Sequence, residues 1–146
     1  MTENKLTRAL RQAVRLRAKG CCEYCLSQEK FATQSFSIDH IIPTSKEGKT
    51  ELDNLALACQ GCNNFKYDKV EGIDRLTEDK VPLYNPRKEE WQTHFAWDKS
   101  YTQIVGLTPT GRATIEELKL NRSGLINLRQ ILYAMDEHPP NRNGNN

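Results

Sequence analysis

Four cysteines in two Cys-x-x-Cys pairs are the clearest chemical feature of this 146-residue chain. Cys22 and Cys25 form the first pair, and Cys59 and Cys62 form the second. The two-residue spacing lets both sulfurs of a pair face one ion, so two pairs supply the four ligands of a tetrahedral zinc site. Structural zinc sites of this kind are closed, so we expect the ion to hold the fold and to do no chemistry. The alternative, four unrelated buried cysteines, is disfavoured because the pairing repeats.

Cys21 is left over directly before the first pair. It could replace Cys22 as a ligand, but the two-residue spacing favours Cys22. We expect Cys21 to be a small buried residue or a free thiol.

Polar residues between and just after the cysteine pairs are suited to a second, catalytic site. Asp39 and His40 are adjacent, Asn63 directly follows Cys62, and Lys66 comes three residues later. An Asp-His pair alone is weak evidence, because a histidine on a strand is more often a hydrogen-bonded core residue. Its place between the two halves of the zinc site strengthens the case, and a zinc ion on Cys62 would fix the position of Asn63.

The order of these residues forms a longer motif. The chain reads Asp-His-Ile-x-Pro from Asp39, Asn-Leu from Asn54, and Cys-x-x-Cys-Asn-x-x-Lys from Cys59. With the upstream cysteine pair, this order resembles the HNH endonucleases, whose core is a ββα-metal fold. The stretches VPLYNPRKEEW, HFAW and GLTPTGRAT are similar to the C-terminal half of small stand-alone bacterial members. The resemblance therefore covers roughly residues 8–135.

The resemblance implies a role for each matching residue. His40 would be the general base that activates water, while Asp39 and Asn63 would hold the catalytic divalent cation. Asn54 would be the middle residue of the motif, which fixes the backbone near the histidine. Asn63 stands where many members have histidine, a common variant. The loop at residues 46–49 reads KEGK, where relatives often carry a glycine pair, and this departure concerns the shape of the loop.

These residue types fit hydrolysis of a DNA phosphodiester. A neutral imidazole accepts a proton from water near pH 7, and a bound cation relieves charge at the phosphoryl and leaving oxygens. The carboxylate of Asp39 and the amide oxygen of Asn63 are hard ligands, which predicts one Mg²⁺ or Mn²⁺ ion. The resemblance implies 5′-phosphate and 3′-hydroxyl products. In a regular strand Asp39 and His40 would point to opposite faces, so a shared site needs a strand end or a bulge there.

The N-terminal segment predicts a basic helix. Thr7 can cap a helix that runs to about Lys19 and stops at Gly20. Arg8, Arg11 and Arg15 would share one face, and with Lys66 they are the candidate DNA contacts. The alternative is an ordinary solvated helix face.

The remaining elements must hold this core. We expect a strand or hairpin arm within residues 31–42, a polar loop at 43–51, and a short helix from about Gln60. After a loop at 67–90, we expect a hairpin over 95–107, a helix from Pro109 to about Leu120, and another capped by Ser123. Trp91, Phe95 and Trp97 read as core aromatics. The predicted fold class is α+β, a ββα-metal (HNH) core at about residues 20–70 with a structural zinc site, plus the N-terminal helix and the C-terminal hairpin and helices.

Composition bounds the other properties. The net charge is +2, of which residues 1–20 carry +5, so the rest of the chain is at −3. The length suits a single nuclease domain over residues 1–137, with residues 138–146 as a disordered tail. No apolar run approaches a membrane span and no signal peptide is evident, which favours a cytoplasmic protein without membrane contact.

The predicted function is a metal-dependent HNH endonuclease acting on DNA. One such site nicks one strand, so double-strand cleavage would need a homodimer or two events. The first alternative is a zinc-ribbon module that binds nucleic acid without cleaving it. The second alternative is a protein-interaction domain whose nuclease site has decayed. It is disfavoured because every catalytic residue type is present.

Overall fold

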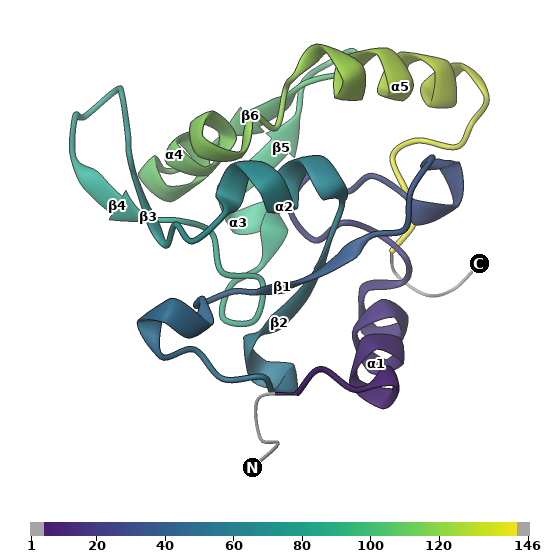
Figure 1. Ribbon diagram of the computed structural model, residues 1–146. Helices are drawn as coiled ribbons and strands as arrows, with labels where there is room; N and C mark the ends of the chain where they lie inside the picture. Colours follow the sequence, from purple (N-terminus) through teal and green to yellow (C-terminus); the bar gives the residue numbers. More distant parts are fainter. Residues whose placement is uncertain (1–4, 143–146) are drawn as a thin grey trace.

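Two antiparallel strands and the helix after them form the centre of the molecule. We describe a computed structural model that places residues 5–142. Strand β1 (Ser37–His40) pairs with β2 (Leu55–Ala58) in regular register, from Ser37 opposite Ala58 to His40 opposite Leu55. Helix α2 (Gln60–Lys66) follows β2 after a single residue and lies beside the hairpin (Figure 1). The short helix predicted from about Gln60 is thereby confirmed.

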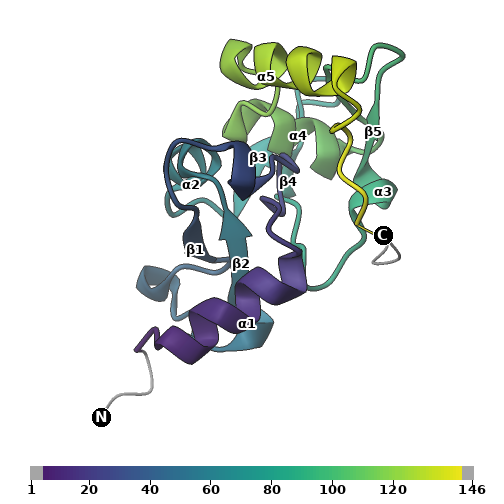
Figure 2. The same cartoon turned by 90° about the vertical axis from the view of Figure 1, so that its right-hand side faces the viewer.

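Helix α1 (Arg8–Ala18) packs against β2 (Figure 2). The Thr7 side chain accepts a hydrogen bond from the Leu10 amide at 3.1 Å, which starts the helix. Lys19 ends it in the left-handed conformation. Val14 and Ala18 are buried against the core, and the predicted extent of this helix is confirmed.

The C-terminal half adds two hairpins and three helices. Its elements in chain order are β3 (Glu71–Ile73), β4 (Lys80–Pro82), α3 (Trp91–His94), β5 (Phe95–Trp97), β6 (Ile104–Gly106), α4 (Pro109–Leu118) and α5 (Ser123–Ala134). The predicted β5–β6 hairpin and both long helices are confirmed. Ser123 is the first residue of α5 rather than its cap, because Arg122 occupies the cap position. Short 3-10 turns complete the chain at Glu29–Phe31, Thr44–Lys46 and Leu52–Asn54.

The β3–β4 hairpin corrects the expectation of a loop over residues 67–90. The strands pair with Gly72 opposite Val81. Asp74 organises the turn by accepting hydrogen bonds from the Thr77 hydroxyl and from nearby amides. Arg112 of α4 donates hydrogen bonds to both carboxylate oxygens of Asp74, at 2.9 and 3.0 Å. A partner 38 residues away therefore stabilises a hairpin whose own sequence carries a weak strand signal.

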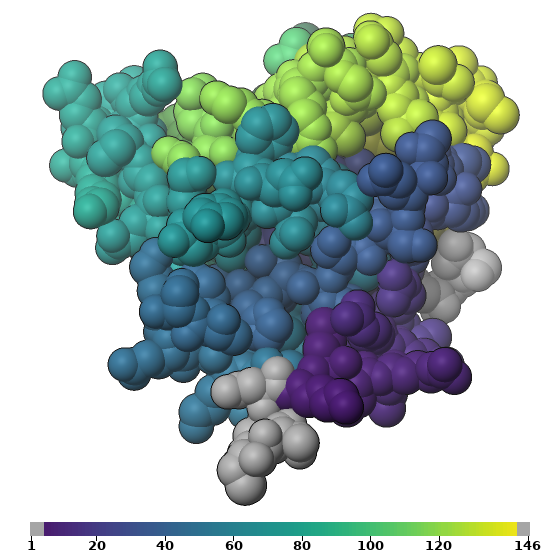
Figure 3. Space-filling view, viewed as in Figure 1, coloured from purple at the N-terminus to yellow at the C-terminus, as the bar shows by residue number. Residues whose placement is uncertain are grey.

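The helices and antiparallel hairpins form an α+β fold, and one hydrophobic core joins them. All four residues of β2 are buried, and Phe95 packs against both Tyr84 and Trp91, as expected for core aromatics. In the space-filling view the segment from β1 to α2 lies between α1, purple, and the helices α4 and α5, green to yellow (Figure 3). The central motif is therefore held from both ends of the sequence.

The first residues of the expected disordered tail are placed in the structure. His138 is buried, its Nε2 lies 2.7 Å from the Tyr101 carbonyl oxygen, and its ring packs on Trp97. The expectation of disorder therefore does not hold at His138, while residues 143–146, like residues 1–4, lie outside the described part of the chain. Within that part, no helix has the length and apolar character needed to cross a membrane.

Candidate metal centre and active site

The two cysteine pairs meet in one buried cluster. The sulfurs of Cys22, Cys25, Cys59 and Cys62 all lie within 4.8 Å of one another. In each pair the second amide points at the first sulfur at 3.4 Å, from Cys25 to Cys22 and from Cys62 to Cys59. Cys59 is also the cap of α2, so the cluster fixes where that helix begins. Four soft sulfur ligands in a closed, buried site fit the coordination that structural zinc requires.

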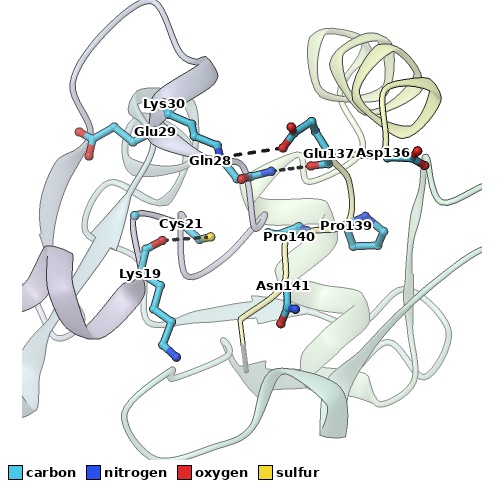
Figure 4. Close-up of a pocket in the computed structure, with 11 residues that line it drawn as sticks. Lys19, Cys21, Gln28, Glu29, Lys30, Asp136, Glu137, Pro139, Pro140 and Asn141 are labelled. Carbon is cyan, nitrogen blue, oxygen red and sulfur yellow. Dashed lines mark hydrogen bonds and ion pairs between the residues drawn. The ribbon is translucent and has the colours of Figure 1, made fainter. Parts of the chain in front are cut away.

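Cys21 lies outside this cluster. It is buried, and its sulfur lies 3.7 Å from the Lys19 carbonyl oxygen. Burial raises the pKa of its thiol. The residue borders a pocket of about 590 Å³ between the end of α1 and the segment after α5 (Figure 4). The assignment of Cys22 rather than Cys21 to the cluster agrees with this geometry.

The Asp39 side chain turns inward to a buried ion pair with α2. Its Oδ2 lies 3.2 Å from the Lys66 ammonium nitrogen and accepts a hydrogen bond from the Tyr24 hydroxyl at 2.7 Å. Its Oδ1 is 3.4 Å from the same ammonium nitrogen. Exposure is only 4% for Asp39 and 1% for Lys66. Asp39 is thus held by one residue of α2 and by one residue of the first cysteine loop.

Burial and the neighbouring charge have opposite effects on the pKa of Asp39. Burial raises the pKa of Asp39, whereas the Lys66 charge and the Tyr24 hydrogen bond act to lower it. Burial also raises the pKa of Tyr24 well above its usual range, and the Asp39 charge adds to that shift. The phenol therefore keeps its proton and serves as a donor to Asp39.

The location of Lys66 corrects its assignment as a DNA contact. Its ammonium group points into the protein and donates to the Ile41 carbonyl at 2.9 Å and to the His40 carbonyl at 3.4 Å. A buried ammonium with a carboxylate partner is not available to a phosphate. Lys66 instead ties α2 to the end of β1.

His40 is half-buried at the end of β1. Its Nε2 lies 2.8 Å from the Thr50 hydroxyl oxygen. Burial lowers the pKa of the imidazole, while the Asp39 charge acts to raise it. Regular pairing of β1 places the Asp39 and His40 side chains on opposite faces, and within residues 5–142 no hydrogen bond joins them. Lys66 contacts the carboxylate of Asp39 and the backbone carbonyl of His40, so it links the two residues without touching the imidazole.

Asn54 fixes the chain directly after His40. Its amide oxygen accepts from the Ile42 amide at 2.9 Å, and its Nδ2 donates to the carbonyls of Ile42 and Lys49, each at 2.9 Å. Gly48 must lack a side chain, because a Cβ there would lie 1.7 Å from the Ile42 oxygen. A single glycine therefore suffices in the KEGK loop, and the geometry agrees with the backbone role expected of Asn54.

Asn63 lies in the first turns of α2, directly after the cluster cysteine Cys62. Its amide bonds to the Cys59 carbonyl at 2.9 Å, and its side chain is half-buried. Asn63 and Lys66 are three residues apart and share one face of the helix. Because Lys66 on that face contacts Asp39, the face that carries Asn63 is the one turned towards β1.

The predicted arginine face of α1 is only partly available to a ligand. Arg8 and Arg11 are exposed. Arg15 instead pairs with Glu29 at 3.2 Å and donates to the Phe36 carbonyl at 3.1 Å, so it joins α1 to the segment before β1. The contact surface expected from three arginines is therefore reduced to two of them.

Two residues of the site escape sequence reasoning. Tyr24 reaches Asp39 from inside the first cysteine pair, and Thr50 reaches His40 from the loop before β2. A tyrosine between two candidate ligands is a signal that could have drawn attention to the first. The sequence offers no comparable signal for Thr50.

Comparison with known proteins agrees with this geometry. The model of the HNH endonuclease family matches residues 22–69. No curated protein and no solved structure matches the chain. The matched segment contains both cysteine pairs, Asp39, His40, Asn54 and Asn63. The resemblance of residues 22–69 to the HNH endonucleases, first seen in the motif order, is thereby confirmed.

Proposed function

We propose that this protein is a DNA endonuclease with a ββα-metal core, in which His40 is the general base. The observation that carries the proposal is the arrangement inside the family match. Strand β1 ends at His40, the residue directly after the buried Asp39, and helix α2 carries Asn63 directly after a cysteine of the cluster. These are the positions that hydrolysis of a phosphodiester requires to be fixed.

The surroundings of His40 suit a base. The lowered pKa keeps the ring neutral near pH 7, the form that accepts a proton. Nε2 lies 2.8 Å from the Thr50 hydroxyl oxygen, and in the tautomer in which Nε2 donates to that oxygen, Nδ1 is unprotonated and can take the proton from water. Asn54 supports this geometry because its side chain hydrogen-bonds the backbone of Ile42, two residues after His40.

Asp39 and Asn63 are the proposed ligands of one Mg²⁺ or Mn²⁺ ion. Oδ2 of Asp39 accepts from Tyr24 and lies 3.2 Å from the Lys66 nitrogen, whereas Oδ1 lies 3.4 Å from that nitrogen and has no contact with Tyr24, so we assign Oδ1 to the cation. A carboxylate and an amide oxygen are ligands that both ions accept. When bound, the cation would relieve charge on the phosphate and on the leaving oxygen. The four cysteines would hold zinc for structure alone.

A zinc-ribbon module that only binds nucleic acid is the second candidate. The cysteine cluster and the exposed Arg8 and Arg11 are compatible with it. A binding module, however, has no need of Asp39, His40 and Asn63 together, and the segment that matches the family contains all three. The active-site arrangement therefore favours the nuclease.

Nicking of supercoiled plasmid by the purified zinc-loaded protein tests the proposal. We expect nicking with Mg²⁺ or Mn²⁺, none without an added divalent ion, and loss of nicking in His40→Ala at unchanged zinc content and melting temperature. Full zinc content without nicking under either ion would favour the binding module. Nicking by His40→Ala would refute the base assignment.

The neighbouring asparagines of α2 provide a matched pair for the cation site. Asn63 is half-buried on the face towards β1, whereas Asn64 is exposed. Asn63→Ala should raise the Mn²⁺ concentration needed for half-maximal nicking, and Asn64→Ala should leave it unchanged. Equal effects of the two substitutions would contradict the assignment of Asn63 as a ligand.

A further inference from the structure

Arg122, at the corner between α4 and α5, reaches back to the cysteine cluster. Its Nη2 lies 3.4 Å from the sulfur of Cys59 and 3.8 Å from that of Cys62, and its Nη1 lies 3.7 Å from Cys62. These N–H groups donate to two of the four sulfurs, both from the second cysteine pair. Arg122 lies more than fifty residues beyond the segment that matches the HNH family.

Several independent contacts hold the guanidinium in this position. Nη1 also donates to the Leu118 and Lys119 carbonyls at 3.1 and 3.0 Å, where α4 ends. The charged group lies over the Phe65 ring at 5.6 Å from its centre. Gly61 leaves the space that the guanidinium fills, because a Cβ on Gly61 would come within 2.4 Å of Nη2. The contact with sulfur is therefore built by residues from α2, α4 and the corner itself.

The charge of the cluster explains what such a contact does. Zinc with four thiolates carries a net charge of about −2, which is costly in a buried site without compensation. A cation that hydrogen-bonds two of the thiolates lowers this cost and makes those sulfurs poorer targets for protonation. Groups that hydrogen-bond metal ligands commonly change metal affinity by about 10–100-fold.

We propose that Arg122 retains the zinc ion by hydrogen-bonding the thiolates of Cys59 and Cys62, and so makes the C-terminal helices part of the metal site. The inference rests on the proposed zinc site and extends it to a residue outside the family match. It predicts that zinc is held less firmly whenever the α4–α5 corner moves away from α2.

The rate at which a chromophoric chelator removes zinc from the folded protein, well below its melting temperature, measures this retention. We expect Arg122→Met to release zinc about 10–100-fold faster than the unsubstituted protein. Arg122→Lys should fall between them, because it keeps the charge but loses the two-pronged contact. Arg75→Met, which removes an exposed arginine paired with Glu116, is the control and should release zinc at the unsubstituted rate.

Gly61→Ala separates the sulfur contact from the helix-end contacts of Arg122. The added methyl group should push the guanidinium off the cluster while leaving arginine at position 122, so zinc release should again accelerate. This variant also covers the case in which Arg122→Met does not fold. In the cobalt-substituted protein, Arg122→Met and Gly61→Ala should both shift the sulfur-to-cobalt charge-transfer bands.

The possible outcomes distinguish a failure of the zinc assignment from a failure of the role proposed for Arg122. A protein that purifies without one zinc per chain would refute the zinc site itself. One zinc per chain, with Arg122→Met and Gly61→Ala releasing it at the unsubstituted rate, would refute the role of Arg122 and leave the zinc site standing. A lower melting temperature with unchanged release would reduce Arg122 to a helix-end contact and also overturn the proposal.

Discussion

Replacing Lys66 with methionine should be one of the most destabilising single changes in this protein. The substitution preserves length and apolar bulk but removes the ammonium group that contacts Asp39, Ile41 and His40. It leaves a carboxylate that is 4% exposed with the Tyr24 hydroxyl as its remaining close partner.

The magnitude follows from the burial of both partners. Removing one member of a buried ion pair costs about 3–5 kcal/mol, because the other charge stays desolvated without compensation. Whole domains are stable by about 5–15 kcal/mol, so the loss is a large share of the total. At about 2–4 °C per kcal/mol for a chain of this size, the melting temperature should fall by roughly 6–20 °C.

Urea denaturation of the zinc-loaded protein measures this change, and two further variants sharpen it. Lys69→Met is the matched control, because Lys69 is half-exposed and pairs loosely with Glu117 at 3.8 Å. Its cost should stay below about 1 kcal/mol. Adding Asp39→Asn to Lys66→Met should recover about 1–3 kcal/mol, since the uncompensated charge is removed.

A cost for Lys66→Met as small as that for Lys69→Met would refute the reasoning. So would an Asp39→Asn substitution that adds its full cost on top of Lys66→Met. Either result would mean that the two side chains do not form a desolvated pair in solution.

Three more predictions follow from the site and its support. Thr50→Val should slow nicking by less than the ~10²–10⁴-fold expected for His40→Ala, because it loosens the base without removing it; an unchanged rate would exclude Thr50 from orienting His40. Cys59→Ser should lower both zinc content and melting temperature, since metal binding is coupled to folding and Cys59 also caps α2; normal values of both would remove Cys59 from the ligand set. The Arg112 hydrogen bonds hold the pKa of Asp74 well below its ordinary value of 3.8, so its contribution to stability is present above that pH and is lost as the pH falls further. Asp74→Asn should therefore lower stability near neutral pH and flatten the acid side of the stability profile, and an unchanged profile would contradict the assignment.

Residue spacing was sufficient to predict the cysteine cluster and the short helix that follows it. The two Cys-x-x-Cys pairs constrain their own turns, and Gln60 to Lys66 follows as a helix because Cys59 caps it. The α1 helix was equally predictable, because Thr7 and Gly20 mark its ends locally. Local signals decide such elements, and they lie within a few residues of one another.

The contacts that depend on distant partners were not predictable. Lys66 looked like a surface cation because the sequence does not show which face of a short helix is buried. The β3–β4 hairpin depends on the hydrogen bonds from Arg112 to Asp74. The cysteine cluster is contacted by Arg122, which lies 60 residues after Cys62. In each case the charged group and its partner are far apart in the sequence and come together only in the folded chain. No pattern among neighbouring residues therefore predicts the contact.

Tyr24 has a practical consequence for anyone who assays this protein. It is one residue of the loop between Cys22 and Cys25, and it hydrogen-bonds the carboxylate proposed to hold the catalytic cation. A molecule that has lost its zinc would lose the fixed position of that loop and with it the setting of Asp39. The active fraction of a preparation should therefore equal its zinc-loaded fraction, and specific activity should be expressed per mole of bound zinc rather than per mole of protein.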